Sequence, residues 1–135
     1  MKQIFILKEP ENQINSPEEI FKNIKEIKIN YNQENFIIIC LDTKNKILKM
    51  EVLFKGGLNA CLIDIKTLFR SALIENSCKV IIAHNHPSNS LKPSDEDKDI
   101  FKKLVEAGDI LDLKVLDSII FNKKEFYSLN SENNL

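Results

Sequence analysis

The chain has 135 residues, of which 43% are hydrophobic and 29% are charged, so its length and composition fit one soluble globular domain. Its 19 basic and 20 acidic residues leave a formal net charge of −1, which argues against a broad surface for nucleic acid. No apolar run approaches the roughly 20 residues of a membrane span, and acids follow the short N-terminal apolar stretch too soon for a signal peptide. We expect a cytoplasmic protein that contacts neither membranes nor nucleic acid directly.

The N-terminal part of the sequence predicts one strand and one helix. Residues 3–7, "QIFIL", are typical of a short strand, and a polar turn follows them. A helix is predicted to begin at Ser16, because serine is a common N-cap, Pro17 suits the first helical position and Glu19 completes a capping box. An apolar stripe at helical spacing continues from there, made by Ile20, Phe21, Ile24 and Ile27.

The middle of the chain predicts three strands and a helix. Residues 35–42, "NFIIICLD", form an almost unbroken apolar run, which is typical of a strand buried on both faces. The turn "TKNK" joins it to a second strand, 47–56, and this short connection predicts a hairpin. Residues 65–76 have helical periodicity, and "KVIIAH", 79–84, predicts a third core strand.

The C-terminal part predicts a long helix and two closing strands. The helix is expected from Ser94 to Ala107, with Gly108 as the C′ residue that ends it. The strands are predicted at 113–121 and 125–129, on either side of an "NKK" turn.

The alternation of strands and helices predicts a single α/β domain over residues 1–135, with one sheet flanked by helices. The first strand and helix, within residues 1–30, are expected to pack on the core, and residues 130–135 are expected to be a frayed tail. The three cysteines are widely spaced, lie among apolar neighbours and form no CxxC pair. They therefore predict buried, reduced thiols and argue against a four-ligand structural zinc site.

Both histidines of the chain lie in "AHNHPSNSLKPSDED", residues 83–97. His84 and His86 are separated by one residue at the end of a predicted strand, so their side chains project to the same side. Two adjacent imidazoles favour a divalent metal, and a carboxylate in the first turn of the next helix could be a third ligand. Three protein ligands would leave a fourth position for water, as in catalytic zinc sites.

An HNH nuclease, a purely structural helix cap and a zinc deaminase are the other interpretations of this stretch. The contiguous letters "HNH" do not indicate an HNH nuclease, because such a site takes its residues from separate elements and a basic groove. Ser94 and Asp97 also fit a capping box at the start of the helix, so both could be explained without chemistry. The zinc deaminases are excluded, since they need His-x-Glu and Pro-Cys-x-x-Cys.

The stretch resembles the JAMM metallopeptidase motif, which is His-x-His-Pro, a spacer, and then Ser-x-x-Asp. His84, His86, Pro87, Ser94 and Asp97 match it in order and spacing. The sequence is most similar to the RadC-type branch, over about residues 16 to 128, including "KMEVLFKGG" and "LVEAGDILDLKVLDSIIF". The resemblance implies a three-layer JAB/MPN-like domain, similar to cytidine deaminases in fold, with a mixed sheet flanked by helices.

The resemblance also implies a role for each matching residue. His84, His86 and Asp97 are expected to hold Zn²⁺, and Ser94 to hydrogen-bond the oxyanion or the metal-bound water. The general base is expected to be Glu51, an acid inside an apolar strand, where it is costly unless it has a partner. Glu34 is the alternative base, but it begins a strand after "NQ" and exposure to solvent is expected there. Asn85, between the histidines, is expected to point away and to be structural.

The function that the resemblance implies is zinc-dependent hydrolysis of a peptide or isopeptide bond in a protein or peptide substrate. The alternative is a metal-stabilised interaction module without hydrolytic activity, associated with DNA repair or replication proteins. The sequence departs from the RadC pattern at Asn89, where glycine is usual, and at Asp117-Ser118, where Asp-His is usual. The N-terminal helix-hairpin-helix module of full-length RadC proteins does not occur in this sequence either. That module would be the expected means of binding DNA.

Overall fold

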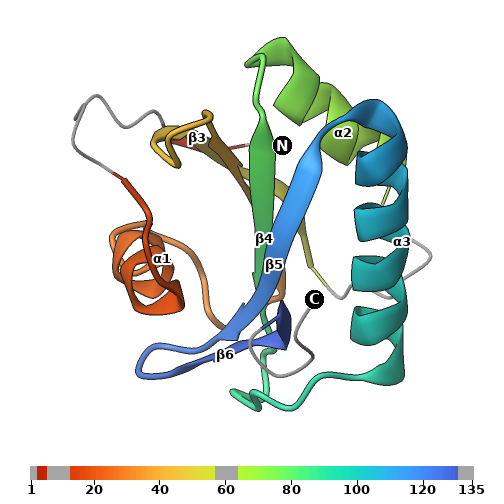
Figure 1. Ribbon diagram of the computed structural model, residues 1–135. Coiled ribbons are helices and arrows are strands. Elements are labelled where there is room, and N and C mark those ends of the chain that lie inside the picture. The colour runs from red at the N-terminus through yellow and green to blue at the C-terminus, as the bar shows by residue number, and fades with distance from the viewer. Residues whose placement is uncertain (1–2, 6–12, 57–63, 131–135) are drawn as a thin grey trace.

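The computed structural model describes residues 3–5, 13–56 and 64–130. In these ranges six strands form one sheet in the order β1-β3-β2-β4-β5-β6 (Figure 1). The strands are β1 (Gln3–Phe5), β2 (Asn35–Leu41), β3 (Ile47–Lys55), β4 (Lys79–Asn85), β5 (Lys114–Phe121) and β6 (Phe126–Ser128). The helices are α1 (Pro17–Ile24), α2 (Ile65–Ile74) and α3 (Asp95–Leu111).

The sheet is mixed. β2 and β3 form the predicted antiparallel hairpin, and β2 also pairs antiparallel with β4. β4 and β5 are parallel, and α3 connects them as a crossover on the side of the sheet where α2 also lies (Figure 1). The prediction of an α/β domain with a mixed sheet flanked by helices is therefore confirmed.

The helices cover the two faces of the sheet and give the fold three layers. α1 lies on one side, whereas α2 and α3 lie together on the other (Figure 1). Successive side chains of a strand point to opposite faces. Accordingly, Ile37 and Ile39 of β2 pack in the core beneath α1, and Phe36 and Ile38 pack in the core beneath α2 and α3. This arrangement explains why β2 is apolar throughout, because all of its residues are buried.

The start of α1 follows the prediction in part. Ser16 is the N-cap, and its Oγ accepts a hydrogen bond from the Glu19 backbone N over 3.3 Å. The Glu19 carboxylate does not close a capping box on Ser16 but accepts instead from the backbone N of Asn15, over 2.8 Å.

The predicted end of the last helix is wrong. α3 does not end before Gly108 but continues to Leu111, and Asp112 is the cap, with a left-handed φ of 59°. Gly108 has a different purpose, because a Cβ built on it would lie 2.3 Å from the carbonyl oxygen of Leu113. The glycine lets the chain turn closely over the helix as it enters β5.

Other predicted elements agree with the structure to within a few residues, apart from segments that the structure does not describe. Of the predicted strand 3–7, only residues 3–5 are described, and residues 131–135 of the predicted frayed tail also lie outside the described ranges. Cys40 is a buried free thiol, as predicted, whereas the free thiol of Cys78 is only partly buried and Cys61 lies outside the described ranges. No helix among the described residues is long and apolar enough to cross a membrane.

Candidate metal centre

The antiparallel pairing of β2 with β4 builds the candidate site. In this register Phe36 lies opposite His84, so the start of β2 is beside the end of β4. Glu34 immediately precedes β2 and His86 immediately follows β4. Ligand atoms of Glu34, His84 and His86 consequently lie within 4.8 Å of one another, close enough to surround one metal ion.

The His84 side chain is buried and has no hydrogen bond among the described residues. The side chain is only 2% exposed, and its ring lies nearly parallel to that of Phe36, with 6.0 Å between centroids. Nε2 lies 3.1 Å from Asp97 Oδ1, but neither Nε2 nor Nδ1 forms a hydrogen bond of acceptable geometry. A buried imidazole without a hydrogen-bond partner is costly, and a coordinated cation would satisfy it.

His86 has the hydrogen bond that orients a metal-binding histidine. Its Nδ1 lies 2.9 Å from the carbonyl oxygen of Ser90. A carbonyl can only accept, so Nδ1 carries the hydrogen and the neutral ring presents the lone pair of Nε2 to Asp97 Oδ2, 3.1 Å away. Two electron-rich atoms at this distance need a proton or a cation between them. The hydrogen bond with Asp97 is the main reason that the pKa of His86 is raised.

Asp97 faces both histidines from the first turn of α3. Oδ1 lies 3.1 Å from Nε2 of His84, and Oδ2 lies 3.1 Å from Nε2 of His86. Burial alone would raise the pKa of Asp97, but the two histidine rings beside its carboxylate and the hydrogen bond from the Ser94 backbone hold it well below its usual range. The group is therefore a carboxylate at neutral pH, as a metal ligand must be.

Ser94 has the predicted position beside Asp97, at the N-cap of α3. The Asp97 backbone N donates to Ser94 Oγ over 3.0 Å, and the Ser94 backbone N donates to Asp97 Oδ2 over 2.9 Å. Both halves of the predicted capping box are thus present. The box fixes the Asp97 carboxylate in the direction of the histidines.

The structure does not bring Glu51 to this site. Its side chain is buried, accepts a 2.5 Å hydrogen bond from Ser71 Oγ and lies 3.2 Å from Lys49 Nζ. Glu51 of β3 lies opposite Ile38 of β2, whereas His84 of β4 lies opposite Phe36 of β2. Glu51 and His84 are therefore two strand spacings apart across the sheet and two residues apart along it. Strand geometry then separates the Cα atoms of Glu51 and His84 by roughly 12 Å. The partner that an acid in an apolar strand requires is Lys49, rather than a metal centre.

The carboxylate that does lie beside the histidines is that of Glu34, the alternative general base. It is partly buried, and this burial is the main cause that raises its pKa, while the two histidines act to lower it. The signal that could have identified it is the antiparallel pairing of strands 35–42 and 79–84, which places the first residue of one beside the last of the other.

Asn85 holds the Glu34 segment against the end of β4, in the structural role expected for it. The residue is 1% exposed, and its Oδ1 accepts from the backbone N of Asn35 over 2.9 Å. Its Nδ2 donates to the carbonyl of Gln33 over 3.0 Å. These bonds fix the backbone on both sides of Glu34, so the carboxylate is positioned by buried contacts rather than by a loose loop.

A three-layer domain with one helix on one face of a mixed sheet and two on the other, carrying His-x-His at a strand end and an aspartate in the following helix, is a domain of the JAB type. Comparison with known families agrees, since the model of the RadC-like JAB domain matches residues 14–135. The chain belongs to the RadC-like JAB domain family.

Curated relatives are similar to most of this chain, and their names state no activity. The UPF0758 protein of Methanosarcina barkeri is 41% identical over 126 residues, which are 93% of this chain and 55% of the relative. The UPF0758 protein of Roseiflexus castenholzii is 37% identical over 117 residues, 87% of this chain and 50% of the relative. The chain therefore spans about half the length of the curated relatives that it matches.

Proposed function

We propose that this domain is a zinc-dependent hydrolase of amide bonds in protein or peptide substrates. His84, His86 and Asp97 would hold the ion, and Glu34 would be the general base. The observation that carries the proposal is the buried His84 ring, whose nitrogens have no hydrogen bond among the described residues although a carboxylate lies 3.1 Å away. Two imidazoles and one carboxylate are a ligand set that zinc uses in catalytic sites.

Zinc in such a site lowers the pKa of a bound water to about 7 and polarises the carbonyl that is attacked. The protein supplies the proton transfers. The Glu34 carboxylate lies beside the two histidines and its pKa is raised by burial, so it is suited to accept a proton from water and return it to the departing amine nitrogen. The arrangement supports Glu34 for this role over Glu51, because the Glu51 carboxylate is bound by Lys49 and Ser71.

Ser94 is suited to stabilise the developing oxyanion. Its Oγ accepts from the backbone N of Asp97, which leaves the hydroxyl hydrogen available for donation to a substrate oxygen. The residue is exposed at the start of α3, on the same short segment that carries Asp97. Capping the helix and donating to a substrate use different parts of the hydroxyl, so one residue can do both.

The test is zinc content and peptide hydrolysis, measured together on four proteins. The wild type should hold a single zinc ion and His86→Ala should lose it. Glu34→Gln should keep the zinc and lose hydrolysis by about 10²-fold or more, the effect expected of a general base. Glu51→Gln, if folded, should keep both the zinc and the activity.

Each contrary result has a distinct meaning. A wild-type protein that binds no zinc after reconstitution would refute the metal centre. Zinc loss in Glu34→Gln as complete as in His86→Ala would make Glu34 a ligand instead of the base. Full zinc occupancy without cleavage across a broad peptide and isopeptide panel would favour a metal-stabilised interaction module.

A further inference from the structure

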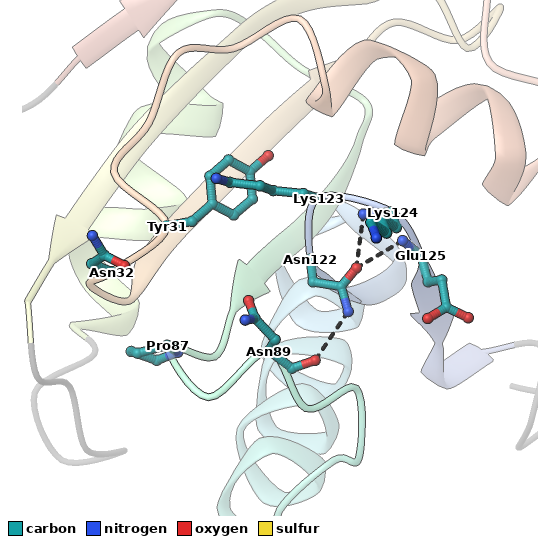
Figure 2. Close-up of a pocket in the computed structure, with 8 residues that line it drawn as sticks. All are labelled: Tyr31, Asn32, Pro87, Asn89, Asn122, Lys123, Lys124 and Glu125. Atoms are coloured by element: carbon teal, nitrogen blue, oxygen red, sulfur yellow. Dashed lines mark hydrogen bonds between the residues drawn. The ribbon is translucent and has the colours of Figure 1, made fainter.

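The loop before β2 and the loop after β4 line one pocket, the first with Tyr31 and Asn32 and the second with Pro87 and Asn89 (Figure 2). None of these four residues belongs to the candidate metal centre. The first loop, however, ends at Glu34, the proposed base, which immediately precedes β2. The contacts that tie this loop to its neighbours therefore decide where the Glu34 carboxylate lies.

Two buried asparagine side chains tie the loop to β4. Asn85, the last residue of β4, donates from Nδ2 to the carbonyl of Gln33 over 3.0 Å, and its Oδ1 accepts from the backbone N of Asn35 over 2.9 Å. The Asn35 side chain adds to this contact, because its Nδ2 lies 3.0 Å from the Gln33 carbonyl and 3.1 Å from Asn85 Oδ1. The two asparagines are 0% and 1% exposed, so breaking these bonds would leave buried polar groups without partners.

Gly56 ties Glu34 to the strand on the other side of β2. It directly follows β3, and its backbone N donates to the Glu34 carbonyl over 3.0 Å. Its φ is 98°, a conformation that glycine adopts readily and other residues adopt rarely. A Cβ on this residue would have no described atom within 4 Å, so an alanine there would act through backbone strain and not through collision.

Together these bonds hold both peptide groups that flank Glu34. The Gln33 carbonyl is held on one side, and the Glu34 carbonyl and the Asn35 N–H are held on the other. Because a peptide group is planar, holding the two groups fixes φ and ψ of Glu34 and the direction of its Cβ. Among the described residues no hydrogen bond holds the carboxylate itself, so its place beside the histidines depends on this backbone. Asn35, Asn85 and Gly56 thus form a clamp on Glu34.

We propose that Asn85 and Gly56 are positioning residues for the proposed reaction, and that they hold Glu34 as a fixed base from the two strands that flank β2. The inference rests on the proposed function, since it concerns the base of that reaction. The proposed ligands are held by other contacts: His84 by the pairing of β4 with β2 and β5, and Asp97 by the cap of α3. The clamp should therefore govern turnover and leave zinc binding unchanged.

The test compares Asn85→Ala and Gly56→Ala, which loosen the clamp from opposite sides, with Ser128→Ala. The control also removes a buried side-chain donor, the hydroxyl that bonds the Asp117 carboxylate. It lies on β6, however, which is three places from β2 in the sheet. A change seen in the first two variants but not in the control is therefore not a general effect of a weakened interior.

Two readouts are taken on each variant. Zinc content, kcat and KM are measured on the zinc-loaded protein, with the member of the peptide and isopeptide panel that the wild type cleaves fastest. On the zinc-free protein, nuclear Overhauser effects between the Glu34 side-chain protons and the ring protons of His84 and His86 report where the carboxylate lies. The second readout does not depend on activity.

We expect Asn85→Ala and Gly56→Ala to keep the zinc ion and the wild-type KM while kcat falls by about 10-fold to 10²-fold, the loss expected when a reacting group is misplaced by roughly 1 Å. The nuclear Overhauser effects between Glu34 and the histidine rings should be lost in both variants. Ser128→Ala should keep the zinc, the kcat and these effects. A purely structural role of the clamp would lower the stability of the variants and leave the kcat of the folded protein unchanged.

Either a wild-type kcat or undiminished nuclear Overhauser effects in both clamp variants would overturn the proposal. Loss of zinc from both would overturn it too, because the clamp would then hold the ligands rather than the base. Gly56→Ala decides alone if Asn85→Ala does not fold. A wild-type protein that neither binds zinc nor cleaves the panel would refute the proposed function, and the effects measured without zinc would still decide whether the clamp places Glu34.

Discussion

Ser94 and Asp97 exchange hydrogen bonds in both directions, and the Asp97 oxygen that accepts from Ser94 is also the one that lies 3.1 Å from His86. The cap of α3 and the candidate metal centre therefore share an atom. Any change that loosens the cap should also loosen a proposed ligand, which makes helix stability and metal affinity measurable together.

Ser94→Ala should lower both the free energy of unfolding and the affinity for zinc. Loss of an N-cap hydroxyl costs about 1 kcal/mol of unfolding free energy. The substitution removes the acceptor of the Asp97 backbone N but keeps the Ser94 backbone N that donates to Oδ2, so Asp97 should be held less firmly and bind zinc more weakly. The matched control is Ser16→Ala, which removes the corresponding hydroxyl from the N-cap of α1. Urea unfolding and zinc competition against a chromogenic chelator measure the two effects. Equal zinc affinity in the two variants would show that the cap does not position Asp97.

Glu51→Gln should destabilise the fold without releasing zinc. The Lys49 and Glu51 side chains are about equally buried and lie 3.2 Å apart. Neutralising Glu51 removes the buried partner of the Lys49 ammonium and leaves it only the more distant, more exposed Glu75, at a cost of about 3 kcal/mol. Glu75 offers the control, because it lies 3.8 Å from the same ammonium but is 36% exposed, and Glu75→Gln should cost about 0.5 kcal/mol or less. Unfolding curves and zinc content check both variants. Zinc loss at unchanged stability in Glu51→Gln would contradict the structural role.

Gly108→Ala should destabilise the protein even though alanine is the better helix former by about 1 kcal/mol. The added Cβ would lie 2.3 Å from the Leu113 carbonyl oxygen, a backbone atom that cannot move aside cheaply. Overpacking of this kind costs about 2 kcal/mol. Ala107→Gly measures the helix propensity at the adjacent position of α3. If Gly108→Ala were instead stabilising by the amount that Ala107→Gly loses, the close approach would not constrain the residue.

The raised pKa of Asp117 should make the free energy of unfolding decrease as pH rises through the weakly acidic range. Burial raises its pKa above the ordinary 3.8, although Ser128 Oγ and the backbone N of Asn130 hydrogen-bond its carboxylate. The folded state then binds the proton more tightly than the unfolded chain does. The resulting stabilisation is complete below 3.8 and is lost as pH rises through the folded-state pKa.

Asp117→Asn cannot titrate, so its unfolding free energy should improve relative to wild type as pH increases over this window. Urea unfolding in the presence of a chelator, at several pH values upward from about 3.5, measures the difference. Asp64→Asn should show a pH dependence of the opposite sign. A hydrogen bond from Thr67 lowers the pKa of Asp64, so the contribution of Asp64 to the unfolding free energy is lost as pH falls. A pH-independent difference between Asp117→Asn and wild type would contradict the raised pKa.

Local patterns were sufficient to predict most of the secondary structure. Strand β2 and the hairpin that it forms with β3 follow from an unbroken apolar run and a short polar turn. His84, His86 and Asp97 could be grouped for the same reason, since strand periodicity and a helix start place them within one short segment. A glycine near the end of a predicted helix can either end the helix or allow another part of the backbone to lie close to it, and Gly108 does the second. Only the position of Leu113 in space decides between them.

The choice between Glu34 and Glu51 depends on contacts that the sequence does not display. An acid inside an apolar strand needs a partner, and that expectation for Glu51 was correct, but Lys49 and Ser71 provide it. Glu34 looked exposed because it stands at a strand end next to polar residues. It becomes partly buried through the pairing of β2 with β4 and the bonds that Asn85 makes across it.

The proposed ligands all lie between residues 84 and 97, whereas Glu34 reaches them only through strand pairing between distant parts of the chain. Closing a short loop costs less conformational entropy than closing a long one. Capture of the metal is then a local event, and placement of the base is a consequence of global folding. In partly destabilised protein, the capacity to hydrolyse should disappear at lower denaturant concentrations than the capacity to retain zinc.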